Sequence, residues 1–142
     1  MELSEQAEAL RGQAETEARQ LGHRYVSTEH LLLAIARNAS SRLTDALVRL
    51  EVEPSELIEQ IYASVAVGSP DEGKDAIPFS PRVTKTFERA LSEAAELGGE
   101  RAEPEHVLIA LLEDEESVAA QVLEHYGVDY ASTLGAVRRI PD

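Results

Sequence analysis

The sequence predicts an all-α protein of about eight helices, built as two tandem four-helix repeats related by a pseudo-twofold axis. Three observations predict this fold. The 142 residues suit a single compact domain. Aromatic residues make up only 4% of the chain while hydrophobic residues make up 43%, so the core is aliphatic, which favours helices over a β-sandwich. The chain also matches itself when it is shifted by 76 positions.

The internal match runs without a gap from residues 3–66 onto residues 79–142. Chance would give about four identities over this length, so thirteen indicate a duplication. The identical positions, numbered in the first copy, are Ser4, Ala14, Glu17, Ala18, Leu21, Gly22, Glu29, His30, Leu32, Ala34, Ser41, Leu47 and Val52. Residues 67–78 contain two Gly, two Pro and four charged residues, which is typical of a loop. We therefore expect one domain over 1–142, made of repeat one (3–66), a linker (67–78) and repeat two (79–142).

The first helix of each copy has the clearest start signal. Ser4 and Ser80 are N-cap candidates because a serine hydroxyl accepts from the free amides of the first turn. Pro81 follows at the first helical position, where its missing N–H costs nothing. These helices are predicted over 5–20 and 81–97, and they end near Gly22 and Gly98.

The remaining helices follow the same register. The second helices are predicted to start at Ser27 and Glu103, with Pro104 in the first turn of the second copy and Thr28 at that place in the first. They carry wide apolar faces made of Leu31, Leu32, Ile35, Val107, Leu108, Leu111 and Leu112. The third helices are predicted over about 41–51 and 116–126, and the fourth begin near Pro54 and Asp129. No segment predicts a strand.

Charge and missing motifs exclude several function classes. A net charge of −14 repels phosphates and anionic lipids, so nucleic acid and membrane surfaces are not expected partners. No stretch approaches about 20 apolar residues and the N-terminus is acidic, so we expect a cytoplasmic protein with no membrane span. The chain has no Cys, no phosphate-binding P-loop and no dinucleotide or hydrolase motif. We expect no cofactor, no metal and no enzymatic activity.

Glu29 and Glu105 form the most informative polar pair, since each lies in the first turn of the second helix of its copy. Three interpretations stay open. The carboxylates could serve only as partners of the helix dipole, which contributes about 0.3–1 kcal/mol. They could face a groove and receive a guanidinium group in a bidentate pair. They could also join His30 and His106 in a small helical metalloprotein or enzyme, although adjacent Glu and His point about 100° apart on a helix, which favours hydrogen-bonding or packing roles for both histidines.

The duplicated motifs resemble a known family. The first copy reads L-G-H-x-x-x-S-T-E-H-L-L over 21–32, the second reads L-G-G-x-x-x-E-P-E-H-V-L over 97–108, and F-S-P-R opens the second copy at 79–82. These blocks resemble the N-terminal domain of Clp/Hsp100 unfoldases, in particular the ClpC type, over the whole chain. The resemblance implies a non-catalytic module that binds substrate and adaptor proteins for a hexameric Clp ATPase ring, which passes substrates to a ClpP-type protease.

The resemblance also implies a set of site residues for phosphoarginine on proteins marked for degradation. The two Glu residues of the repeated blocks, Glu29 and Glu105, would receive the guanidinium group, with Thr28 beside the first. Ser4 and Ser80, at the starts of the first helices, would hold the phosphate, because a helix N-terminus favours anions. Gln6 stands where a basic residue is expected, whereas the second copy keeps Arg82 and adds Lys85. Ser27 and Glu103 replace a Gly of the family pattern, and Glu103 adds negative charge. The better phosphoarginine site is therefore expected to combine Ser80, Arg82 and Glu105.

Two further expectations come from the resemblance. Leu3 and Phe79 border the groove in which cyclic-peptide antibiotics bind some relatives, with Lys85 nearby, and Leu3 replaces an aromatic residue there. The end of the chain, 138–142, fits both an excised N-terminal module and a freestanding protein. The departures from the family blocks favour slightly a freestanding form, which would sequester modified proteins or compete with the unfoldase for adaptors.

Overall fold

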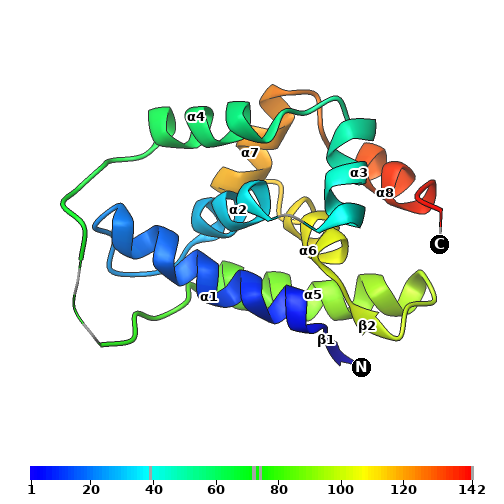
Figure 1. The fold of residues 1–142 in the computed structure, drawn as a ribbon, viewed down its shortest axis with the longest axis horizontal. Helices are drawn as coiled ribbons and strands as arrows, with labels where there is room; N and C mark the ends of the chain where they lie inside the picture. The colour runs from blue at the N-terminus through cyan, green and yellow to red at the C-terminus, as the bar shows by residue number, and fades with distance from the viewer. Residues whose placement is uncertain (39, 72, 74, 142) are drawn as a thin grey trace.

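The computed structural model describes residues 1–38, 40–71, 73 and 75–141. Over this part of the chain the protein is all-α with eight helices, as predicted, plus two strands of two residues each (Figure 1). The elements are β1 (Glu2–Leu3), α1 (Glu5–Gln20), α2 (Thr28–Arg37), α3 (Ser41–Arg49), α4 (Pro54–Ser64), α5 (Pro81–Glu96), β2 (Arg101–Ala102), α6 (Pro104–Leu111), α7 (Val118–His125) and α8 (Tyr130–Arg138).

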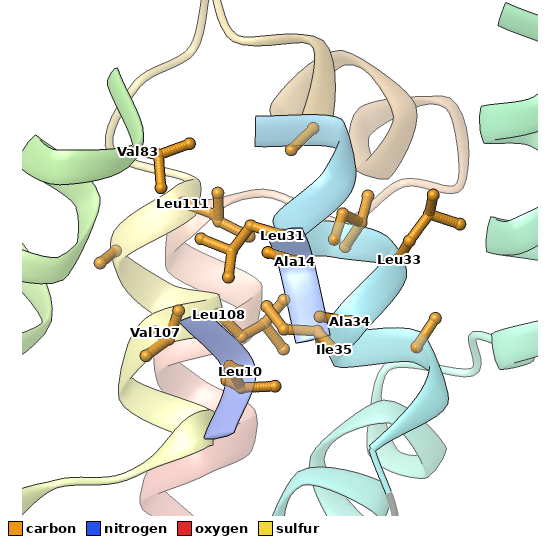
Figure 2. Packing of buried hydrophobic residues seen from close by; sticks show 14 of the residues in the cluster. Leu10, Ala14, Leu31, Leu33, Ala34, Ile35, Val83, Val107, Leu108 and Leu111 are labelled. Carbon is orange, nitrogen blue, oxygen red and sulfur yellow. The ribbon is translucent and has the colours of Figure 1, made fainter. Parts of the chain in front are cut away.

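Helices α2 and α6 form the centre of the molecule. Every residue of α6 is buried, and so is every residue of α2 except Arg37, because these sequences are apolar on nearly all sides. Helix α1 packs on α2, and α5 packs on α6, while α3, α4, α7 and α8 cover the opposite side (Figure 1). Figure 2 shows Leu31 of α2 beside Leu111 of α6 in this core.

The two repeats are interlocked by symmetric backbone pairing. Leu3 of β1 lies opposite Ala102 of β2, and Phe79 forms an isolated parallel bridge with Val26. These two pairs are equivalent under the shift of 76 residues. The amide of Ser4 donates to the carbonyl of Ala102 at 2.9 Å, and the amide of Ser80 donates to that of Val26 at 2.8 Å. The start of each long helix is therefore attached to the other repeat, as a pseudo-twofold axis requires.

The expectation that the chain has no strand was wrong at these positions. Two residues are too few for an alternating pattern to be visible in a sequence. The pairing arises because the fold places residues 2–3 beside 101–102, about 100 positions away.

The observed helix boundaries agree closely with the predicted ones. Ser4 Oγ accepts from the amide of Ala7 at 3.1 Å, and Ser80 Oγ accepts from the amide of Val83 at 3.3 Å, which confirms both N-caps. The third helices, α3 and α7, are shorter than predicted by one or two residues at three of their four ends, which is the usual uncertainty of a helix boundary.

The glycines that follow α1 and α5 provide a matched prediction. Gly22 and Gly98 have positive φ angles of 73° and 80°, which an L-residue adopts at a cost of about 1 kcal/mol. A Cβ on Gly22 would also clash with the Ser69 carbonyl oxygen, whereas a Cβ on Gly98 would meet open space. Gly22→Ala should therefore lower the melting temperature clearly more than Gly98→Ala in thermal unfolding. Equal losses would mean that the 68–71 segment does not rest on the end of α1.

The division of the chain into repeat one, linker and repeat two stays a prediction in its boundaries. Glu72 and Lys74 of the linker, and Asp142 at the end of repeat two, lie outside the described residues. Among the residues that are described, no helix is long and apolar enough to cross a membrane.

Candidate functional site

Glu29 lies in the first turn of α2, at the start of a buried helix. Its side chain is 8% exposed and accepts a hydrogen bond from the hydroxyl of Ser27. Beside it, the hydroxyl of Thr28 accepts from the amide of Ala119 at 3.3 Å, so the first turn of α7 rests on this end of α2. Within the described part of the chain, Glu29 forms no ion pair.

Glu105 occupies the equivalent place in α6, but its carboxylate is already paired. Its side chain is 2% exposed, and Oε2 accepts from Nε of Arg42 in α3 at 2.8 Å. The same guanidinium donates through Nη1 to the carbonyl oxygen of Pro141 at 3.0 Å. Glu105 is therefore paired with a guanidinium group of the chain itself, whereas the family resemblance implies the guanidinium group of a ligand.

The two histidines of the repeated blocks serve as helix caps. The backbone amides of Ser27 and Glu103 donate to Nδ1 of His30 and of His106, each at 2.9 Å. Burial lowers the pKa of both rings, in His30 to about 4, against an opposing effect of the neighbouring glutamates. The interpretation of His30 and His106 as hydrogen-bonding residues is confirmed.

His30 has a second partner that the other copy lacks. Its Nε2 lies 2.7 Å from Nδ1 of His23, whose Nε2 lies 2.6 Å from the carbonyl oxygen of Ala66. Both rings are satisfied when neutral, since each then has one donor and one acceptor. Across residues 1–38, 40–71, 73 and 75–141, no group of three or more His, Asp or Glu side chains could hold a metal ion.

The predicted site residues come together from different repeats. Ser4 and Glu105 line one cavity of about 800 Å³, together with Gln6, Arg42, Arg101 and Glu103 among others. Neither Ser80 nor Arg82 lines it. The expected grouping of Ser80, Arg82 and Glu105 was therefore wrong. The reason is the backbone pairing between the two repeats. The amide of Ser4 bonds to Ala102, which precedes α6, and the amide of Ser80 bonds to Val26, which precedes α2.

Arg82, the predicted phosphate ligand, is held by acidic residues of the loop before α7. Its Nη1 donates to both carboxylate oxygens of Asp114, at 2.6 and 2.7 Å, and Nη2 lies 3.9 Å from Glu116. The hydrogen bond and the charge of Asp114 raise the pKa of Arg82. The position equivalent to Asp114 in the first copy is the neutral Asn38. A phosphate group at the start of α5 would thus compete with Asp114 for Arg82.

A second hollow of about 510 Å³ lies between the starts of α1 and α5. Leu3 and Phe79 line it, with Met1, Phe87 and Leu91 as its other apolar residues. Arg11 also lines this hollow, and its guanidinium group lies over the ring of Phe87, 4.8 Å from the ring centre. Lys85 is exposed and is not among the lining residues, so its predicted place in this groove was wrong. Thr84, one position earlier on α5, lines the hollow instead.

Arg42 is the residue of this cavity that sequence reasoning missed. Comparison of the two copies carries a signal for it, because the position equivalent to Arg42 is Val118. An arginine in only one copy, close to the start of α3, marks a difference between the two sites. Its partner could not be deduced, since Glu105 lies 63 residues away.

Comparison with known proteins identifies the family. The Clp repeat (R) N-terminal domain family matches residues 2–126 and 79–140. The chain is 34% identical over 126 residues to the chaperone protein ClpB of Oceanobacillus iheyensis. It is 35% identical over 126 residues to the negative regulator of genetic competence ClpC/MecB of Bacillus subtilis. Both alignments cover 89% of the chain, which spans only about 15% of the length of these relatives.

Solved structures show the same fold. The Hsp104 N-terminal domain of Candida albicans superimposes with a TM-score of 0.77 at 17% identity, covering 98% of this chain and 91% of the other. The N-terminal domain of ClpD from Arabidopsis thaliana gives 0.72 at 23% identity, covering 95% and 94%. A ClpV N-domain in complex with a VipB peptide gives 0.69 at 19% identity, covering 94% and 88%. The chain belongs to the Clp N-terminal domain family.

Proposed function

We propose that this chain is a non-catalytic protein-binding module that recognises substrate and adaptor proteins for a Clp-type unfoldase. Its membership of the family and the relatedness to ClpC/MecB support this role. The ClpV N-domain that binds a VipB peptide has the same fold, which supports peptide binding as a use of it. The ATPase ring and the protease would belong to partner proteins or to other domains, since the chain contains no nucleotide-binding motif.

The proposed ligand is a phosphoarginine side chain, and one observation carries this choice. Glu29 is a buried carboxylate without a cationic partner among the described residues. It follows shortly after Val26, whose carbonyl oxygen accepts from the amide of Ser80, the N-cap residue of α5. The carboxylate would accept the guanidinium group, and the first turn of α5 with Arg82 would hold the phosphate. A site with both features discriminates phosphoarginine from arginine and from phosphoserine, because each of those carries one of the two charges.

The apolar hollow between α1 and α5 is the proposed docking place for adaptor segments. Its lining combines the apolar side chains of Leu3, Phe79, Phe87 and Leu91 with the carboxylates of Glu2, Glu8 and Glu88. Such a surface suits an apolar segment flanked by basic residues. As a freestanding protein, the same module would compete with the unfoldase for adaptors or sequester modified proteins.

Titration calorimetry with phosphoarginine tests the proposed ligand. We expect the protein to bind phosphoarginine, and Glu29→Gln to weaken binding by about tenfold or more, since a charge-assisted hydrogen bond contributes about 1.5–3 kcal/mol. Asp114→Asn should strengthen binding, because it releases Arg82 from a competing carboxylate.

The control ligands are arginine and phosphoserine, which should bind far more weakly than phosphoarginine. Thermal unfolding of each variant checks that the fold is retained. Absence of binding to the natural protein, or equal binding by Glu29→Gln, would reject phosphoarginine as the ligand of this site.

A further inference from the structure

Glu29 and Glu105 are the two buried carboxylates that could each bind a guanidinium group, and each is called a glutamate seat below. The two seats differ in the residues that surround them. Arg42 comes from α3 in repeat one, and its guanidinium pairs with Glu105 in repeat two at 2.8 Å. Its second hydrogen bond, to the Pro141 carbonyl oxygen, fixes its direction across the cavity. Glu105 is 2% exposed, so this contact neutralises a carboxylate that solvent barely reaches.

The equivalent place at the other seat carries a valine. Val118 corresponds to Arg42 and is the first residue of α7, the helix whose next amide, that of Ala119, donates to the Thr28 hydroxyl. The start of α7 thus lies against the start of α2, as the start of α3 lies against α6. Valine has no donor, and Glu29 keeps only the Ser27 hydroxyl as its partner in the described part of the chain.

We propose that Arg42 is an internal ligand that fills the Glu105 seat and excludes the arginine-type side chain of a partner from the 800 Å³ cavity. Of these two glutamates, Glu29 is then the one without a cationic partner in the described part of the chain, and each chain takes one guanidinium side chain there. This inference rests on the proposed function. It adds how many guanidinium-binding sites each chain has and where they lie.

The stoichiometry of phosphoarginine binding tests the inference. The natural protein should bind one molecule per chain through Glu29. Arg42→Val, which installs the residue of the second copy, should open a second site, and the added change Glu105→Gln should close it again. Arg49→Val removes an arginine of the same helix that pairs with the partly exposed Asp45, so this variant should bind as the natural protein does. An unchanged stoichiometry in Arg42→Val would overturn the inference while leaving the proposed function intact.

A second measurement separates the inference from the choice of ligand. Methylguanidinium carries the cation of arginine without the phosphate, and it should raise the melting temperature of Arg42→Val more than that of the natural protein or of Arg42→Val with Glu105→Gln. If no variant bound phosphoarginine but this stabilisation occurred, the proposed ligand would fail and the seat would stand. If methylguanidinium stabilised all three proteins equally, Glu105 would not be a guanidinium seat. If Arg42→Val does not fold, Arg42→Gln replaces it in both measurements, because glutamine removes the guanidinium group but keeps a hydrogen-bond donor towards Glu105.

Discussion

Replacing Arg37 with leucine is expected to lower the free energy of unfolding by about 2–4 kcal/mol, because it leaves a buried carboxylate without its cation. Glu17 in α1 is 1% exposed, and its Oε2 forms an ion pair with Nε of Arg37 in α2 at 2.9 Å. Gln13 donates to the same oxygen at 2.6 Å. The other oxygen, Oε1, has no hydrogen-bond partner among the described residues, so little remains to stabilise the charge. Urea unfolding at neutral pH measures the loss.

Arg49→Leu is the matched control for this variant. Arg49 pairs with Asp45 at 3.1 Å on the surface of α3, and both side chains are more than a third exposed. Such a pair contributes about 0–1 kcal/mol. The double change Glu17→Leu with Arg37→Leu should recover most of the stability, since it removes the buried charge together with its partner. A loss in Arg37→Leu no larger than that in the control would contradict the prediction.

Glu113→Gln is expected to stabilise the protein above pH 7 by about 1–2 kcal/mol, allowing for solvent at this partly exposed group. Glu113 is the counterpart of Arg37, so the second copy places a carboxylate beside the buried Glu93 where the first copy places a cation. Burial, then a hydrogen bond to Glu93 and its charge, raise the pKa of Glu113 to about 7, against the opposing charge of Arg89 at 3.3 Å. Glutamine keeps a donor towards Glu93 but needs no proton.

The direction of the pH effect follows from that raised pKa. Between pH 4.5 and 7 the folded protein keeps a proton that the unfolded chain has lost, so the contribution of Glu113 to stability falls as pH rises through this window. Glu113→Gln and the natural protein should thus differ little in this contribution near pH 4.5 and most above pH 7. Urea unfolding at several pH values gives the difference curve.

Two comparisons isolate the effect of Glu113. The lowered pKa of His30 makes stability fall as pH falls from 6.5 towards 4, which is the opposite direction, but it acts equally in both proteins and cancels in their difference. Glu88→Gln removes an exposed carboxylate of α5 that does not act on the pKa of Glu113, and it should change stability by no more than about 0.5 kcal/mol. Parallel pH curves for Glu113→Gln and the natural protein would show that Glu93 and Glu113 share no proton.

The expectations that succeeded concern interactions between close neighbours in the sequence. The caps of α1 and α5 depend on a serine hydroxyl and an amide three residues later. Burial of α2 and α6 follows from their apolar composition. The prediction that Glu29 and Glu105 share a helix-start position follows from the repeat. Each of these features is encoded within one turn or within the period of 76, and is therefore visible without a structure.

The sequence by itself determined the helices, their caps, the duplication and the family. Only the tertiary structure decided which serine lies near which glutamate, because the pairing of β1 with β2 joins residues about 100 positions apart. It also decided that one seat is filled, since Arg42 reaches Glu105 across 63 residues through the packing of α3 on α6. Local hydrogen bonds specify where helices begin, whereas the partners of a buried charge are set by how the two copies pack together.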